Sequence, residues 1–170
     1  MTQPSIKFGA NANQSVVSLH TIGVLTGILD AAGLSSCLIT STSRTPADQA
    51  RIMHNNIVRD GVVKQKKLYA AAGDAVIDEF VRGKKAGETK AQIIALMEAR
   101  IRAIGPERVS HHCADPAVLN VVDVAPSSVK NKQAFESAVA AAKSQGTVSR
   151  FITPGQHDPA YHLEIPQPTI

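Results

Sequence analysis

The sequence is poor in aromatic residues and in cysteine. Its 170 residues include no tryptophan, two tyrosines and four phenylalanines, so the flat side chains on which single-stranded nucleic acids stack are nearly absent. Two cysteines, Cys37 and Cys113, are too few for a disulfide scaffold or for a zinc site made of cysteines alone. Charged residues make up only 19%, and the formal net charge is +4. This weak positive charge permits an acidic partner, but we expect no nucleic-acid partner.

Long apolar runs are missing as well. Residues 16–29 and 134–142 form the most apolar stretches, and polar side chains interrupt both of them, so we expect no membrane insertion. The first residues lack the basic and apolar regions of a secretory signal. We therefore expect synthesis in the cytoplasm without a signal peptide. If the protein acts outside the cytoplasm, its delivery must use a route that needs no classical signal.

The apolar residues that the chain does contain are enough for one folded domain over residues 1–170, because they make up 44% of the sequence. Hydrophobic spacing and capping signals predict helices, and β-branched apolar runs predict strands. The predicted helices span residues 14–32, 46–59, 67–81, 89–104 and 132–144. The predicted strands span residues 36–42, 118–125, 148–153 and 161–165, and residues 5–8 form either a short strand or an ordered tail. This order predicts an α+β fold in which helices pack on a small antiparallel sheet, with a helical hairpin inserted at about 65–105.

Three polar segments carry the residue types that a hydrolytic metal site needs. They are residues 40–46, 110–124 and 156–164. A zinc ion that activates water needs three nitrogen or oxygen ligands and one open position. It also needs a side chain that accepts the proton and a cation that stabilises the oxyanion. The candidate ligands are His112, Asp123 and His162, and the candidate cation is Arg44.

The order of these motifs resembles a family of zinc peptidases that includes D-alanyl-D-alanine carboxypeptidases and dipeptidases, phage L-alanyl-D-glutamate endolysins and the hedgehog signalling domain. That family carries an arginine turn at a strand end, then Ser-x-His, then Ala-x-Asp, and then a late Glu-x-x-His. The matching segments here are residues 41–46, 110–112, 121–124 and 161–164. The resemblance covers about residues 16–166 and implies a hedgehog/DD-peptidase-like fold.

The chain departs from the family pattern in two places. His112 and Asp123 lie farther apart than the corresponding His and Asp of the family. The late acid is Asp158, four residues before His162, where the family has a Glu three residues before its His.

The resemblance implies a zinc ion held by His112, Asp123 and His162. Two neighbouring residues are alternatives: His111 could replace His112, and Asp115 could replace Asp123. Asp115 belongs to an Asp-Pro pair, which favours a turn. Asp123 lies among aliphatic residues on a predicted strand, where a carboxylate without a partner would be costly.

The residue that accepts the proton from water is open among Asp158, Glu164 and His157. Glu164 shares a strand face with His162, so it could instead orient that imidazole. We expect Arg44 to stabilise the oxyanion or to bind a substrate carboxylate. The other candidates for contact with the substrate are Ser110 and Gln49.

The remaining cysteines and histidines are expected to be structural. No Cys-His-Asn pattern accompanies Cys113, so we interpret this residue as a packing residue rather than a nucleophile. Cys37 lies on a predicted buried strand, and His20 and His54 lie on predicted helices.

The residues and the resemblance together predict a zinc-dependent metallopeptidase that hydrolyses peptidoglycan stem peptides, as an endopeptidase or a carboxypeptidase. The resemblance implies substrates that contain D-amino acids. The expected place of action is the cell wall or periplasm, as a phage lysin or an exported antibacterial effector. The alternatives are a hedgehog-like zinc-binding module without catalysis and a basic protein that binds the cell wall or another anionic polymer. The helical hairpin could also bind an immunity or carrier protein.

Overall fold

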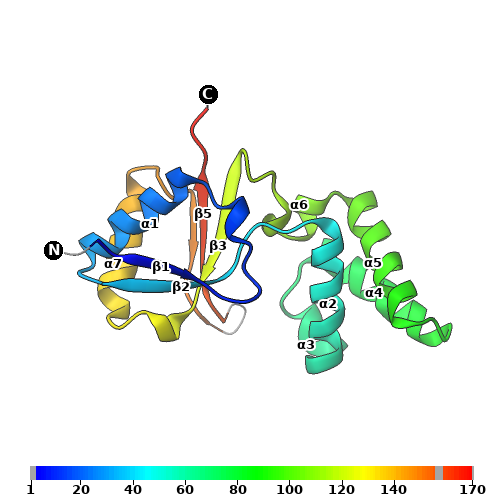
Figure 1. The fold of residues 1–170 in the computed structure, drawn as a ribbon. Coiled ribbons are helices and arrows are strands. Elements are labelled where there is room, and N and C mark those ends of the chain that lie inside the picture. The colour runs from blue at the N-terminus through cyan, green and yellow to red at the C-terminus, as the bar shows by residue number, and fades with distance from the viewer. Residues whose placement is uncertain (1–2, 156–158, 170) are drawn as a thin grey trace. The chain divides into compact units, whose positions relative to one another are not determined.

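The chain forms two compact units in a computed structural model that describes residues 3–155 and 159–169. The first, which we call the sheet unit, consists of Met1–Ser43 and Asp115–Ile170. The second, which we call the helical unit, consists of Arg44–Ala114. Within the described residues the two units contain seven α-helices and a five-stranded mixed sheet, which confirms the predicted α+β class (Figure 1). The expectation of one domain over residues 1–170 stays a prediction, since the division into two compact units does not test it.

The sheet is mixed because its first strand runs parallel to its neighbour. The strands are β1 (Ser5–Phe8), β2 (Ser36–Ser41), β3 (Leu119–Val124), β4 (Arg150–Ile152) and β5 (Tyr161–Pro166). Their order in the sheet is β1-β2-β3-β5-β4. The expected antiparallel pairing holds from β2 to β4 across the sheet, and β1 adds a parallel edge beside β2.

Two helices of the sheet unit, α1 (Leu19–Ala31) and α7 (Lys132–Ser144), pack on the apolar core of the sheet. Ser18 and Asn131 begin them as N-caps, since each side chain accepts a backbone N–H of the first turn. Asn120 of β3 fixes the start of α1, because its Oδ1 accepts the backbone N–H of Ser18 at 2.9 Å. The core residues of the two helices and the strands are Leu25, Ile28, Leu29, Phe135, Val139, Cys37, Ile39, Val122, Val124, Tyr161, Leu163 and Ile165.

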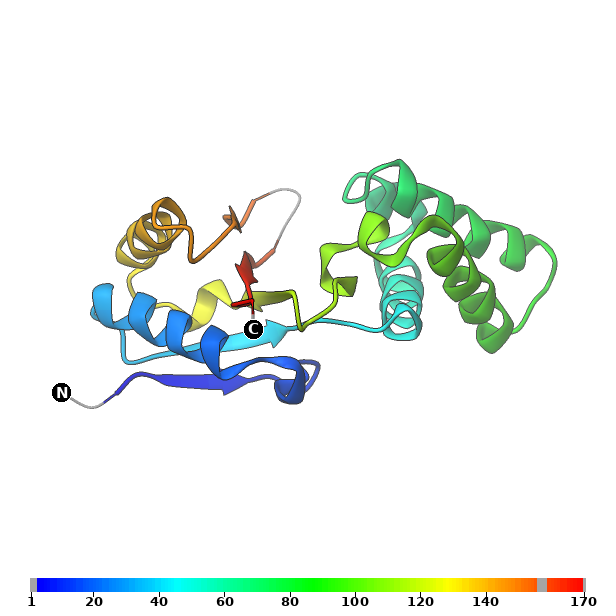
Figure 2. The same ribbon diagram turned by 90° about the horizontal axis from the view of Figure 1, so that it is seen from above.

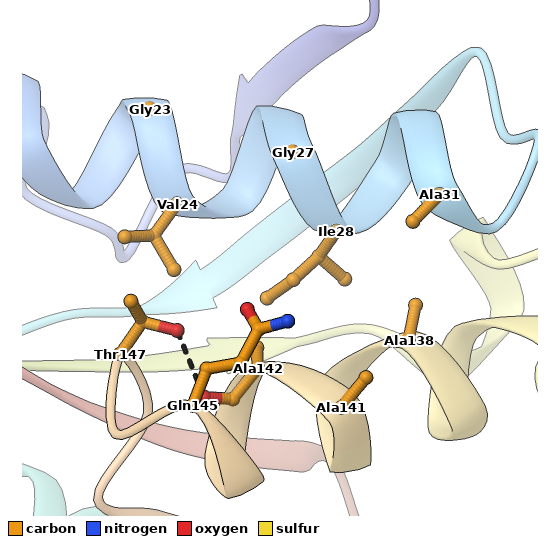
Figure 3. A pocket seen from close by; sticks show the side chains of 10 residues that line it. All are labelled: Gly23, Val24, Gly27, Ile28, Ala31, Ala138, Ala141, Ala142, Gln145 and Thr147. Carbon is orange, nitrogen blue, oxygen red and sulfur yellow. Dashed lines mark hydrogen bonds between the residues drawn. The ribbon is translucent and has the colours of Figure 1, made fainter.

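Small residues line the space between α1 and α7 (Figure 3). Val24, Ile28 and Ala31 of α1 point toward α7, and with Gly23 and Gly27 they line one side of a groove of about 290 Å³. This volume lies at the lower limit of ligand pockets, and none of the described residues that line the groove is charged. The groove belongs to the apolar side of the sheet, so it does not gather the polar residues singled out in the sequence.

The helical unit contains five helices. They are α2 (Pro46–Asp60), α3 (Val62–Lys66), α4 (Ala71–Lys85), α5 (Lys90–Ile104) and α6 (Pro106–Val109). The helices α4 and α5 lie side by side as the expected hairpin (Figure 2), and Thr89 and Gln92 form the capping box that begins α5. Gly83 allows the close approach, because a Cβ atom there would lie 2.8 Å from Cγ1 of Ile93. No helix in the described part of the chain is long and apolar enough to cross a membrane.

Two helix boundaries differ from the sequence-based expectation. The helix expected over 67–81 begins only at Ala71 and continues to Lys85, because residues 67–70 form a turn in which the ring of Tyr69 lies against Gly73. The helix expected over 14–32 begins only at Leu19, because Ser18 caps it, and residues 14–16 form a separate 3-10 turn. The helical unit also includes α2 and therefore extends beyond the insertion expected at about 65–105.

Candidate metal centre

Two neighbouring strands bring Asp123 and His162 together on the polar face of the sheet. The residues pair directly across β3 and β5, and their neighbours Val122 and Leu163 are fully buried in the apolar core. Because successive side chains of a strand point to opposite faces, Asp123 and His162 point away from that core. Nδ1 of His162 lies 3.0 Å from Oδ1 of Asp123, which is a direct hydrogen bond.

A β-bulge in β2 extends this row of residues to a third strand. Ile39 pairs with Val124, whereas Ser41 pairs with Asp123, so Thr40 is the extra residue. The bulge changes the direction of the chain and brings Ser41 into the row of Asp123. The hydroxyl of Thr40 donates to the backbone carbonyl of Asp123 at 3.3 Å. The bulge therefore helps to fix the backbone that carries the carboxylate.

The imidazole of His162 lies between two carboxylates. Its Nε2 is 3.0 Å from Oε1 of Glu164, and its Nδ1 contacts Asp123. Glu164 is only 5% exposed, and its Oε1 also lies 3.6 Å from Nη1 of Arg150 on β4. Burial by itself lowers the pKa of His162, but the hydrogen bonds and charges of Asp123 and Glu164 outweigh it and raise the pKa. Each of the two ring nitrogens therefore faces a carboxylate oxygen at hydrogen-bond distance.

His112 completes a cluster of three residues. It lies in the 3-10 turn His111–Cys113 and is only 7% exposed. Its backbone carbonyl accepts the N–H of Arg44 at 2.6 Å, which ties the turn to the start of the helical unit. One ligand atom from each of His112, Asp123 and His162 lies within 4.8 Å of the others. These three residues, which the sequence proposes as ligands, form a group that could hold a metal ion.

The donor set of this cluster fits a divalent metal ion. Two imidazole nitrogens and one carboxylate oxygen would leave one position open on a four-coordinate ion. A cation at Nδ1 of His162 would take the place of the proton shared with Asp123, while Nε2–H would still donate to Glu164. A carboxylate behind a ligating histidine fixes the tautomer and orientation of the ring. The cluster could therefore hold a metal ion.

Arg44 forms a hydrogen bond with Gln49 inside the helical unit. Nη1 of Arg44 donates to Oε1 of Gln49 at 3.1 Å, and Gln49 is fully buried on α2. Two residues that the sequence proposes for substrate contact are therefore bonded to each other. Because Gln49 is enclosed, we expect it to act on a substrate through Arg44 rather than by direct contact.

Among residues 110–115, only His112 is a buried ligand candidate, and its neighbours have other surroundings. Ser110 is half-buried and precedes the 3-10 turn, and His111 is exposed. Asp115 is exposed, and its Oδ1 accepts the N–H of Ala117 at 2.9 Å as part of a turn. Burial raises the pKa of the Cys113 thiol to about 11, although the charge of Arg44 lowers it. A thiol with that pKa is a poor nucleophile at neutral pH.

The other candidates for the proton acceptor are only in part within the described structure. Asp158 and His157 lie outside the described residues. Glu164 lies inside them, and its Oε1 is already bonded to His162. Its geometry therefore matches the orienting role that the sequence left open.

Three residues near these groups were not singled out in the sequence. Ser41 lies in the segment that matches the arginine turn, but only the bulge in β2 places it beside Asp123. Arg150 precedes an apolar pair on a short strand, a pattern that carries no sign of a site. Tyr69, which contacts Gln49, lies in the turn between α3 and α4 and has no motif around it.

Comparisons of the chain with protein-family models, with curated proteins and with solved structures give no match.

Proposed function

We propose that this chain is a zinc-dependent peptidase that hydrolyses the stem peptides of peptidoglycan. The observation that carries the proposal is the cluster of His112, Asp123 and His162, in which both histidines are buried and the ligand atoms lie within 4.8 Å of one another. Two histidines and one carboxylate with an open position form a ligand set typical of catalytic zinc. The substrate class comes from the resemblance of the motif order to the zinc peptidases named above. It implies peptides with D-amino acids, cleaved at the cell wall or in the periplasm.

The chain supplies oriented side chains around the proposed ion. Bound zinc would lower the pKa of a coordinated water to about 7 and polarise the scissile carbonyl. Glu164 fixes the ring of His162 through the bond from Nε2. Arg44, held by Gln49, supplies the positive charge for the oxyanion or for a substrate carboxylate.

We assign acceptance of the water proton to Asp158, with His157 as the alternative. Glu164 is the weaker choice, because its Oε1 accepts from His162 and also faces Arg150. A general base must be able to reach the water and must have a lone pair free to accept its proton. We expect Asp158→Ala to keep zinc and to lose hydrolysis. If His157→Ala keeps zinc and loses hydrolysis while Asp158→Ala stays active, His157 is the proton acceptor instead.

The test combines zinc analysis with digestion of purified sacculi. Zinc in the purified chain is measured by elemental analysis, and released peptides are identified by mass spectrometry. We expect bound zinc and cleaved stem peptides for the natural chain, and loss of both in His112→Ala. His111→Ala is the matched control, because this histidine is exposed and adjacent.

The outcomes also separate the alternative functions. Zinc without cleavage would overturn the peptidase and support a zinc-binding module. Binding to sacculi without zinc would support a basic protein that binds an anionic polymer. The phage-lysin or exported-effector setting and an immunity or carrier partner for the hairpin are parts of the same proposal.

A further inference from the structure

Tyr69 lies behind the pair formed by Arg44 and Gln49. Nε2 of Gln49 donates to the hydroxyl oxygen of Tyr69 at 3.2 Å, and Oε1 of the same amide accepts from Arg44 at 3.1 Å. The Tyr69 ring packs against the backbone of Gly73, where a Cβ atom would approach the ring to 2.5 Å. The hydroxyl therefore has a fixed position at the far end of the Gln49 amide.

The two ends of the Gln49 amide are chemically different, and Arg44 can form a hydrogen bond with only one of them. A guanidinium carries donors and no acceptor, so it needs the oxygen of the amide. If the amide turned over, its NH2 group would face the guanidinium with two donors opposed. Because the hydroxyl of Tyr69 accepts from Nε2, it favours the orientation that presents Oε1 to Arg44. This relation matters because Gln49 is fully buried and its NH2 group needs an acceptor within the protein.

We propose that Tyr69 is a positioning residue whose hydroxyl sets the amide of Gln49 and thereby holds the guanidinium of Arg44. The role of Arg44 in hydrolysis rests on the proposed function, but the positioning of Arg44 does not. The two can therefore fail separately.

The first test follows Arg44 itself by NMR of arginine side chains in the full-length chain. In Tyr69→Phe we expect exchange of the Arg44 Nη groups to become about fivefold faster, the factor that one lost hydrogen bond implies. Tyr161→Phe is the matched control, because its hydroxyl donates to Glu136 at 2.7 Å in the sheet unit. Unchanged Arg44 exchange in Tyr69→Phe, or an equal change in Tyr161→Phe, would overturn the proposal.

The second test is rescue. In the double variant Tyr69→Phe with Gln49→Glu, a carboxylate accepts from Arg44 at either oxygen, so the choice between amide orientations disappears. We expect this variant to return Arg44 exchange to within about twofold of the natural chain, well inside the effect of one hydrogen bond. A purely structural role of Tyr69 predicts no rescue, and that result would contradict the proposal.

Activity gives the link to hydrolysis. With a synthetic stem pentapeptide and zinc-loaded protein, Tyr69→Phe should reduce kcat/KM about fivefold at unchanged zinc content. Full kcat/KM in a variant with mobile Arg44 would refute the link between positioning and catalysis. A natural chain that cleaves no stem peptide would refute the proposed function, while the exchange measurement would still decide the role of Tyr69.

Discussion

Removing the charge of Glu164 probes how the proposed metal ligand His162 is held. The substitution Glu164→Gln keeps a similar shape and an oxygen that can accept from Nε2 of His162, which now lies 3.0 Å from Oε1. It removes the negative charge that faces both His162 and Arg150. Because Glu164 is only 5% exposed, water cannot readily replace that charge. We therefore expect a weaker zinc site. We expect the fold to be kept, because the amide has a similar shape and can still accept the hydrogen bond from His162.

The size of the effect follows from the role of the carboxylate. Loss of a group that orients a ligating histidine typically weakens metal binding by about 10- to 100-fold. This corresponds to about 1.4–2.7 kcal/mol of binding free energy. Glu164→Gln should lie toward the lower end of this range, since the amide oxygen can still accept the hydrogen bond.

The assay is competition for zinc against a chelator of known affinity, followed by hydrolysis at saturating zinc. Glu136→Gln is the control, because Glu136 lies on α7 and accepts a hydrogen bond from the hydroxyl of Tyr161 at 2.7 Å. An unchanged zinc affinity in Glu164→Gln would refute the orienting role. Full zinc occupancy with abolished hydrolysis would instead identify Glu164 as the proton acceptor.

Two other properties of the chain lead to direct predictions. The pKa of Cys113 is raised to about 11, so at pH 8 only about one Cys113 thiol in a thousand is ionised. Alkylation of Cys113 should therefore accelerate about tenfold per pH unit toward pH 11. Rapid alkylation at pH 8, or loss of hydrolysis in Cys113→Ser, would contradict the packing role. Gly83→Ala should destabilise the chain by about 1–3 kcal/mol, because its Cβ would lie 2.8 Å from Cγ1 of Ile93. Gly23→Ala meets nothing within 4 Å and should stabilise α1 by up to about 1 kcal/mol; urea denaturation measures both, and equal shifts would refute the packing argument.

The parts of the fold that local chemistry determines could be predicted from the sequence. The spacing of Thr89 and Gln92 predicts a capping box at the start of α5, and this capping box is present. The period of two along the predicted strand placed Glu164 on the same face as His162, and the two side chains do meet, with Nε2 of His162 3.0 Å from Oε1 of Glu164. In these cases the signal lies within a few residues of the feature it predicts.

The features that the sequence did not reveal depend on contacts between distant segments. The bulge at Thr40 exists only in relation to β3, and it places Ser41 beside Asp123. The bond between Tyr69 and Gln49 joins residues twenty positions apart. The parallel pairing of β1 with β2 likewise depends on the path of α1 between them. No local pattern distinguishes these arrangements from ordinary polar or aromatic residues.

The central claim is that His112, Asp123 and His162 hold one metal ion, and zinc stoichiometry after metal removal and reloading tests it most directly. We expect about one tightly bound zinc per chain in the natural protein and in His111→Ala, and none in His112→Ala at the same free zinc concentration. Equal zinc in the two histidine variants, or no tight zinc in the natural protein, would contradict it.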